Sequence, residues 1–148
     1  MKYIFNEITH YRFPTHVNDL VIDRVDAETS EVFITVLDPG ESAPLHVHHD
    51  MEQIFYVIEG AGTLYIGQEQ QAFPLKPGDV ARIPPHTYHR TECKSDKPLR
   101  YLSVDCFVNG RPKEEPTWDS HVKVVCKNFG WKFEDVKLKK RTRPISTP

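Results

Sequence analysis

The amino-acid sequence predicts a single all-β domain that carries a short helix near its C-terminal end. Short segments rich in β-branched and aromatic residues follow one another closely and are separated by turn-forming residues, a pattern typical of a β-sandwich or a β-barrel. Twelve prolines, most of them at loop-like positions, agree with a fold that has many turns. The 148 residues are enough to enclose a hydrophobic core, so we expect one domain over residues 1–148.

The N-terminal residues 1–19 are predicted to form an extended arm. Six apolar or aromatic side chains fall within residues 3–13, which is too many for a free tail. We therefore expect the arm to cover a sheet edge or a partner subunit. We also expect His10 and His16 to be surface histidines, because neither has a second potential metal ligand at short spacing.

Two apolar segments, Leu20–Val25 and Glu31–Leu37, begin the series of predicted strands, and both are rich in β-branched residues. The second segment ends at a turn, residues 38–40, in which proline sets the first corner and glycine accepts a positive φ. The remaining predicted strands are Pro44–His48, Gln53–Ile58, Gly62–Ile66, Gln71–Leu75, Val80–Ile83, Thr87–Cys93 and Leu99–Phe107.

The C-terminal residues 108–148 differ in pattern and are predicted to form a polar loop, a helix and a basic tail. Four apolar residues recur at the i, i+3, i+4 and i+7 spacing of one helix face. We expect Asp119 or Ser120 to cap the start of this helix and Gly130 to end it. His121 is expected on the polar face rather than as a metal ligand. The four apolar residues are Val122, Val125, Cys126 and Phe129.

Charge and composition limit the classes of partner. Five positive charges lie within residues 137–143, and we expect a solvated tail there because no recognised nucleic-acid module accompanies them. A net charge of -2 implies no general attraction to nucleic acid. No apolar run approaches the ~20 residues that span a membrane. Three widely spaced cysteines predict reduced thiols and a cytoplasmic location.

Three histidines carry the pattern that indicates chemistry. His46 and His48 are one residue apart, so on a strand both side chains point to the same face. His89 follows a second stretch that contains glycine and proline, and it is the candidate third imidazole. Neutral imidazoles bind divalent transition metals, so these residues together predict a metal site.

The two stretches resemble the two signature motifs of the cupin superfamily. The residues that match those motifs are Gly40, His46, His48 and Gly60 in the first and Gly78, Pro84 and His89 in the second. The chain departs from the motifs where Gln53 replaces the usual glutamate, His86 a glycine and Cys93 an asparagine. The resemblance implies a double-stranded β-helix, that is, a jelly-roll barrel, with its core at about residues 31–107.

The resemblance also implies one bound divalent metal, which the ligand types leave open among Fe, Mn, Ni and Zn. Counting back from Gly60 selects Gln53 as the fourth ligand, whereas counting forward from His48 permits either Glu52 or Gln53. A glutamine oxygen is a neutral ligand, so the metal charge stays uncompensated and favours a small anionic molecule. The ligand set that we predict is His46, His48, Gln53 and His89.

The expected function is that of a metal-binding cupin that acts on a small molecule. As an enzyme, it would insert dioxygen, remove carbon dioxide or isomerise a sugar or keto acid, with His86 or Glu52 moving protons. The alternative is a protein that binds or senses a small molecule without turnover. A structural jelly roll is the third interpretation. Because small cupins commonly dimerise, we expect a homodimer.

Overall fold

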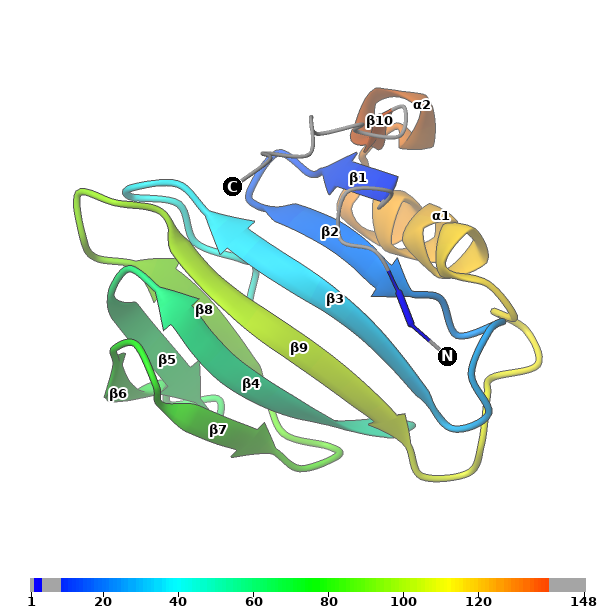
Figure 1. Ribbon diagram of the computed structural model, residues 1–148, viewed down its shortest axis with the longest axis horizontal. Coiled ribbons are helices and arrows are strands. Elements are labelled where there is room, and N and C mark those ends of the chain that lie inside the picture. Colours follow the sequence, from blue (N-terminus) through cyan, green and yellow to red (C-terminus); the bar gives the residue numbers. More distant parts are fainter. Residues whose placement is uncertain (1, 4–8, 139–148) are drawn as a thin grey trace.

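The computed structural model describes residues 2–3 and 9–138, and within them the chain forms two antiparallel sheets and two helices (Figure 1). The larger sheet has the order β10-β1-β2-β3-β9-β4-β7. Its strands are β1 (Thr9–Arg12), β2 (Val17–Ile22), β3 (Ser30–Leu37), β4 (Met51–Glu59), β7 (Val80–Ile83), β9 (Leu99–Phe107) and β10 (Lys137–Leu138). The smaller sheet has the order β6-β5-β8, made of β5 (Gly62–Ile66), β6 (Gln71–Leu75) and β8 (His89–Cys93).

The centre of the larger sheet holds its longest strands. Strand β9 pairs with β3 on one side and with β4 on the other, and its residues alternate between buried and partly exposed positions. This alternation is the pattern of a strand that faces a core on one side only. The core between the two sheets is built on Leu37, Phe55, Val57, Leu64 and Leu99.

The predicted N-terminal arm contains two strands of the larger sheet. Strands β1 and β2 pair as a hairpin and extend the sheet beyond β3, whereas residues 1 and 4–8 lie outside the described residues. The prediction of a surface position is wrong for His10, which is buried and whose Nδ1 contacts the carboxylate of Asp19 across the hairpin. The sequence spacing gave no sign of this pair, because it depends on the register of the hairpin.

The predicted helix is α1 (Trp118–Phe129), followed by a single turn, α2 (Phe133–Val136). The predicted cap was wrong: Thr117 is the N-cap, and its hydroxyl accepts the backbone N–H of Ser120 while the Ser120 side chain accepts the Thr117 N–H. The helix ends at Gly130, which adopts a left-handed conformation with φ 72°. Its apolar face packs on Tyr11, Phe13, Leu20 and Phe33 of the larger sheet and its N-terminal hairpin.

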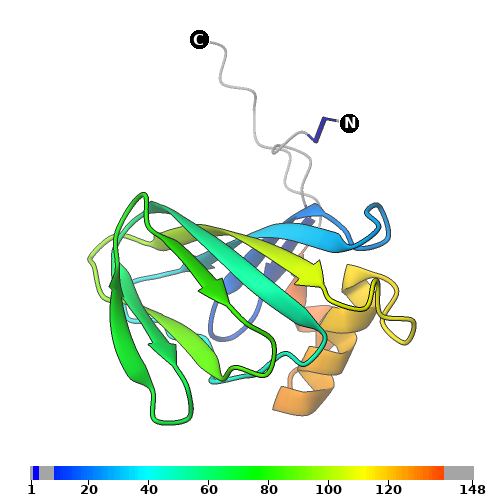
Figure 2. The ribbon, with the colours of Figure 1, turned by 90° about the horizontal axis from the view of Figure 1, so that it is seen from below.

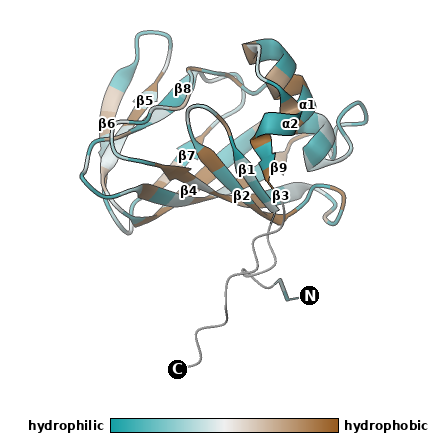
Figure 3. Cartoon of the chain, turned by 90° about the horizontal axis from the view of Figure 1, so that it is seen from above, coloured by the Kyte–Doolittle hydropathy of each residue, from teal (hydrophilic) through white to brown (hydrophobic). Residues whose placement is uncertain are grey.

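Helix α1 and the smaller sheet cover the same face of the larger sheet (Figures 2 and 3). The helix lies over β1 to β3, and the smaller sheet lies over β4 and β9. None of the helices in the described residues has the length and apolar character needed to cross a membrane. The basic tail falls in residues 139–148, outside the described residues, apart from Lys137, whose ammonium lies 2.6 Å from Asp119.

The segment between β3 and β4 is not the predicted strand Pro44–His48. It runs beside β8 and forms isolated bridges with it, at Ser42 with Glu92 and at His46 with His89, and the Ala43 N–H donates to the carbonyl of Thr91 at 3.0 Å, but it forms no continuous ladder. Pro44 has no N–H to continue a ladder. Strand alternation therefore does not by itself place His46 and His48 on one face.

Candidate metal centre

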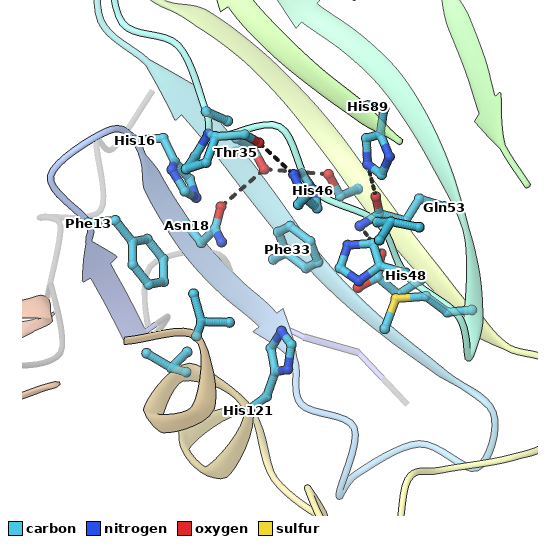
Figure 4. Close-up of a pocket in the computed structure, with 18 of the residues that line it drawn as sticks. Phe13, His16, Asn18, Phe33, Thr35, His46, His48, Gln53, His89 and His121 are labelled. Carbon is cyan, nitrogen blue, oxygen red and sulfur yellow. Dashed lines mark hydrogen bonds between the residues drawn. The ribbon is translucent and has the colours of Figure 1, made fainter. Parts of the chain in front are cut away.

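The three predicted histidine ligands meet at one point in the space between the sheets (Figure 4). His46 and His48 come from the segment between β3 and β4, and His89 is the first residue of β8. One ring nitrogen from each lies within 4.8 Å of the others. Reciprocal backbone hydrogen bonds of 3.1 and 2.9 Å between His46 and His89 hold the two segments together. This cluster satisfies the donor type and proximity that a transition metal requires.

Backbone carbonyl groups orient two of the imidazoles. Nδ1 of His46 donates to the carbonyl of Pro44 at 2.7 Å, and Nδ1 of His89 donates to the carbonyl of Thr87 at 2.9 Å. With the proton on Nδ1, the Nε2 lone pair of each ring is free to face the cluster. Burial lowers the pKa of all three imidazoles, that of His89 to about 3, so they are neutral near pH 7.

Gln53 is buried on β4 beside the cluster. Its Nε2 donates to Asp105 at 2.8 Å, which turns its carbonyl Oε1 toward Nε2 of His89 at 2.7 Å. Both atoms of this second contact are acceptors, because His89 carries its proton on Nδ1. Two lone pairs at this distance repel each other unless a cation binds both. The donor set of the site therefore fits a metal ion.

Glu52, the alternative ligand and candidate proton carrier, lies on the other face of β4. Side chains alternate along a strand, and on this strand Gln53 is buried while Glu52 is paired with Arg82 at 2.8 Å on the outer face. The Glu52 carboxylate is not part of the cavity wall. Gln53 accordingly stays the predicted fourth ligand.

His86, the second candidate proton carrier, also lies outside the cavity wall. It is exposed and adopts a positive φ of 63°, at the position where the family motif has glycine. Its Nδ1 lies 2.7 Å from Nδ1 of His49, which does line the cavity. The structure brings His86 to the rim through this contact but not to the three-histidine cluster.

Buried charged groups stand behind Gln53. Asp105 lies next to Glu31, and burial together with the nearby Glu31 raises the pKa of Asp105 well above its usual range. Arg24 forms a two-point pair with Glu31, at 2.7 and 2.9 Å, and both side chains are almost fully buried. Such a pair is costly to break, because either partner alone would be an uncompensated buried charge. The network therefore fixes the orientation of the Gln53 amide.

A cavity of about 600 Å³ opens between the cluster and helix α1. The metal side of its wall includes the four predicted ligands, and its far side comes from α1 and the β1–β2 hairpin. Apolar and aromatic residues make up much of the lining, among them Phe13, Phe33, Phe55, Val125 and Trp131. The cavity thus offers a polar end at the cluster and a largely apolar body.

Two further histidines line this cavity, and sequence reasoning assigned neither to it. His16 was predicted at the surface, but it stacks on Phe13 with 4.7 Å between ring centroids, and burial lowers its pKa to about 3. His121 was predicted on the polar face of the helix, yet it lines the cavity together with Val125 and Phe129. The i, i+4, i+8 spacing of these three residues is the signal that would have revealed a second helix stripe.

Comparison with known proteins places the chain in a family. Residues 33–105 match the family of the cupin domain. Over 81 residues the chain is 34% identical to auxin-binding protein 1 of Arabidopsis thaliana, covering 50% of this chain and 40% of that protein. Over 70 residues it is 33% identical to L-ectoine synthase of Mycolicibacterium vanbaalenii, covering 47% of this chain and 52% of the enzyme. The chain spans about half the length of these relatives or less.

The fold agrees with this match. A crystal structure described as a predicted oxalate decarboxylase of Thermotoga maritima superposes with a TM-score of 0.61 at 22% identity, covering 73% of this chain and all of that one. With both signature motifs, the matched family and the double-stranded β-helix architecture in agreement, the chain is a small cupin. Three histidines that are able to hold a metal ion lie at the centre of that fold.

Proposed function

We propose that the chain is a metal-dependent cupin that binds and transforms a small anionic molecule in the cavity beneath α1. The observation that supports this most strongly is the three-histidine cluster, with Oε1 of Gln53 placed 2.7 Å from Nε2 of His89. His46, His48, Gln53 and His89 would hold one divalent metal ion, Fe, Mn, Ni or Zn. When bound, the metal would supply Lewis acidity or an oxygen-binding position.

The residues of the chain supply selectivity for the bound molecule. All four proposed ligands are neutral, so no ligand cancels the charge of a divalent ion, and an anionic group on the molecule would do so. The apolar lining keeps water away from the remainder of the molecule and strengthens the attraction at the polar end. A small carboxylate with an apolar body fits both ends of the cavity.

The proposed chemistry is dioxygen insertion, decarboxylation or isomerisation. Three imidazoles and one amide leave coordination positions open for a substrate, which is the mark of a catalytic site. The similarity to L-ectoine synthase supports an enzyme, although the match spans about half of that protein. The proton carriers first predicted, His86 and Glu52, lie outside the cavity wall.

Metal uptake tests the proposal directly. Elemental mass spectrometry on the purified protein should find about one divalent metal ion per chain, as one site predicts. The His48→Ala variant should bind none, whereas Glu52→Gln, on the outer face of the same strand, should retain it. A wild-type protein that neither contains nor takes up a metal would overturn the assignment.

The anionic preference is tested with cobalt-loaded protein. Acetate and benzoate should shift the visible spectrum of bound Co²⁺, and benzoate should bind more tightly because its ring enters the apolar body of the cavity. Glucose serves as the neutral comparison and should leave the spectrum unchanged. A spectrum that responds to glucose but to neither carboxylate would contradict the proposal.

A binding protein without turnover is the second candidate function. The similarity to auxin-binding protein 1 and the largely apolar cavity favour it. Saturable binding of a carboxylate, without oxygen consumption or carbon dioxide release from any bound candidate, would support this alternative over the enzyme.

We also propose that the chain is a cytoplasmic homodimer. The cysteines are free in the structure, consistent with reduced thiols. Tyr56 and Val80, which pair across β4 and β7, expose large apolar side chains on the outer face of the larger sheet. Light scattering at micromolar concentration should give twice the mass of one chain, and the mass of a single chain would exclude the dimer.

A further inference from the structure

His121 has the geometry of an oriented imidazole inside the cavity. It lies in the first turn of α1, and its Nδ1 is 2.9 Å from Oε1 of Glu115. A carboxylate at this position accepts the Nδ1 proton and leaves Nε2 as the free nitrogen of the ring. Figure 4 shows the ring rising from the helix into the cavity.

Glu115 is itself held in place. Its backbone carbonyl accepts a hydrogen bond of 3.0 Å from Nη1 of Arg24, whose guanidinium is fixed by the buried pair with Glu31. The next residue but one, Thr117, caps the helix that carries His121. The bend that carries the carboxylate is therefore held by the buried Arg24–Glu31 pair, and the imidazole is held by the capped helix, as a functional pair requires.

The pair faces the metal centre. His121 lines the same cavity as His46 and His48 and comes from its helix wall. Figure 4 shows His121 on the helix side of the cavity and His46 and His48 on the opposite side. A small molecule held at the cluster would extend toward His121.

We propose that His121, oriented by Glu115, is the acid–base group of this cavity and exchanges a proton with the molecule held at the metal centre. This inference rests on the proposed function. In the forward step an O–H or C–H proton of the molecule passes to Nε2 and the bonding electrons stay on the molecule. The other proton stays on Nδ1, which donates a hydrogen bond to Glu115 and so stabilises the imidazolium. The reverse transfer returns the proton to the product.

The other histidines fit this role less well. Nδ1 of His16 lies 2.8 Å from the hydroxyl of Thr15 instead of a carboxylate, so its partner carries no charge that would stabilise the protonated ring. His86 lies outside the cavity wall and pairs with another imidazole. Among the cavity histidines in the described part of the chain, His121 alone has a carboxylate partner and is not a proposed metal ligand.

The reactivity of Nε2 tests the inference without a known substrate. Diethyl pyrocarbonate modifies histidine when a ring nitrogen attacks its carbonyl carbon, ethyl carbonate leaves with the bonding electrons, and the second ring nitrogen gives up its proton. In zinc-loaded protein the metal protects the three ligands. Glu115 would accept the Nδ1 proton of His121, so this residue should be modified at least about tenfold faster than exposed His86. Peptide mass spectrometry reads both sites in one sample.

The matched variants are Glu115→Gln and Glu52→Gln. The first should slow modification of His121 about tenfold while leaving His86 unchanged, because it removes the proton acceptor but keeps the backbone contact to Arg24. The second removes a carboxylate from the outer face and should change neither rate. Equal rates at His121 in wild type and Glu115→Gln, or a His121 no faster than His86, would overturn the inference.

Zinc content, measured on the same samples, separates the two proposals. A protein that takes up zinc but shows an unreactive His121 contradicts only the acid–base assignment. A protein that takes up no zinc contradicts the proposed function and, with it, the inference built on that function. Thermal unfolding of each variant, followed by circular dichroism, shows that the fold is intact.

Discussion

The two walls of the cavity differ in how the sequence encodes them. On the metal side, His46, His48 and Gln53 lie close together in the chain, and His89 follows within a second compact motif. On the helix side, His16 and His121 come from segments far apart in sequence and meet only after the hairpin and α1 have folded onto the same sheet. The spacing of residues in the sequence therefore predicts the residues of the metal-side wall but gives little information about those of the helix-side wall.

The largest expected effect separates the walls by metal affinity. His48→Ala should lower Zn²⁺ affinity by more than the ~10–100-fold typical of losing an outer-shell partner, because it removes a ligand itself. His121→Ala should leave the affinity unchanged, since that ring belongs to the opposite wall. Competition against a chromophoric chelator measures both. Equal losses in the two variants would show that the walls form one site.

The second test exchanges the amide and the carboxyl group between residues 53 and 105. In the wild-type protein the side-chain N–H of Gln53 donates a hydrogen bond to Asp105. Gln53→Glu replaces this donor with a carboxyl group. In the metal-free protein the change should lower the free energy of unfolding by about 1–3 kcal/mol. Adding Asp105→Asn supplies an N–H donor to the new carboxylate and should restore most of the loss.

Urea unfolding of the two single variants and the double variant completes this cycle. Glu52→Gln is the control, because it changes a carboxyl group on the neighbouring residue without touching Asp105. A double variant as unstable as the sum of the single changes would mean that Asp105 does not orient residue 53. The metal-side wall would then owe its geometry to the histidines alone.

The strands could be predicted because their signal is local. Gly62–Ile66, Gln71–Leu75, Val80–Ile83 and Leu99–Phe107 have the predicted limits, since alternation and turn residues define them within a few positions. Pro44–His48 was wrong because a proline that cannot donate interrupts the ladder with β8. The predicted cap, Asp119 or Ser120, was wrong because the apolar repeat begins only at Val122 and does not mark the first turn, which Thr117 caps.

The surroundings of the site could not be predicted in the same way. Gln53 was favoured over Glu52 by counting from a glycine, and strand alternation does place it inward. The buried partners of Gln53, by contrast, come from β3 and β9 and from Arg24 after β2, so they depend on tertiary pairing. The surface position predicted for His10 and His16 failed for the same reason, because the hairpin buries His10 and folding places His16 in the cavity wall.

The third test uses pH to examine the helix-side wall. The pKa of His16 falls from 6.5 to about 3 on folding because of burial, so between those values the unfolded chain binds one more proton than the folded one. The free energy of unfolding should therefore decrease as pH falls below 6.5, by about 1.4 kcal/mol per pH unit for this group.

Metal-free protein and the His16→Phe variant, unfolded in urea from pH 7 to pH 5, give the measurement. The variant keeps an aromatic ring against Phe13. Its free energy of unfolding should change less with pH, because the contribution of one titrating proton is removed. His89, with a similarly lowered pKa, provides a second contribution that His16→Phe leaves in place. Identical slopes in the two proteins would mean that His16 is not buried as a neutral ring.

The smallest expected effect tests whether the helix-side wall can be loosened alone. Thr117→Ala removes the hydroxyl that caps α1 and should lower the free energy of unfolding by about 1 kcal/mol. Thr117→Ser, which keeps the capping oxygen, is the matched control and should cost much less. Zinc affinity should stay at the wild-type value in both, because the ligands are fixed by β4, β8 and backbone carbonyls. If zinc affinity fell with the cap, the position of α1 would also determine the metal-side wall, and the separation of the two walls would fail.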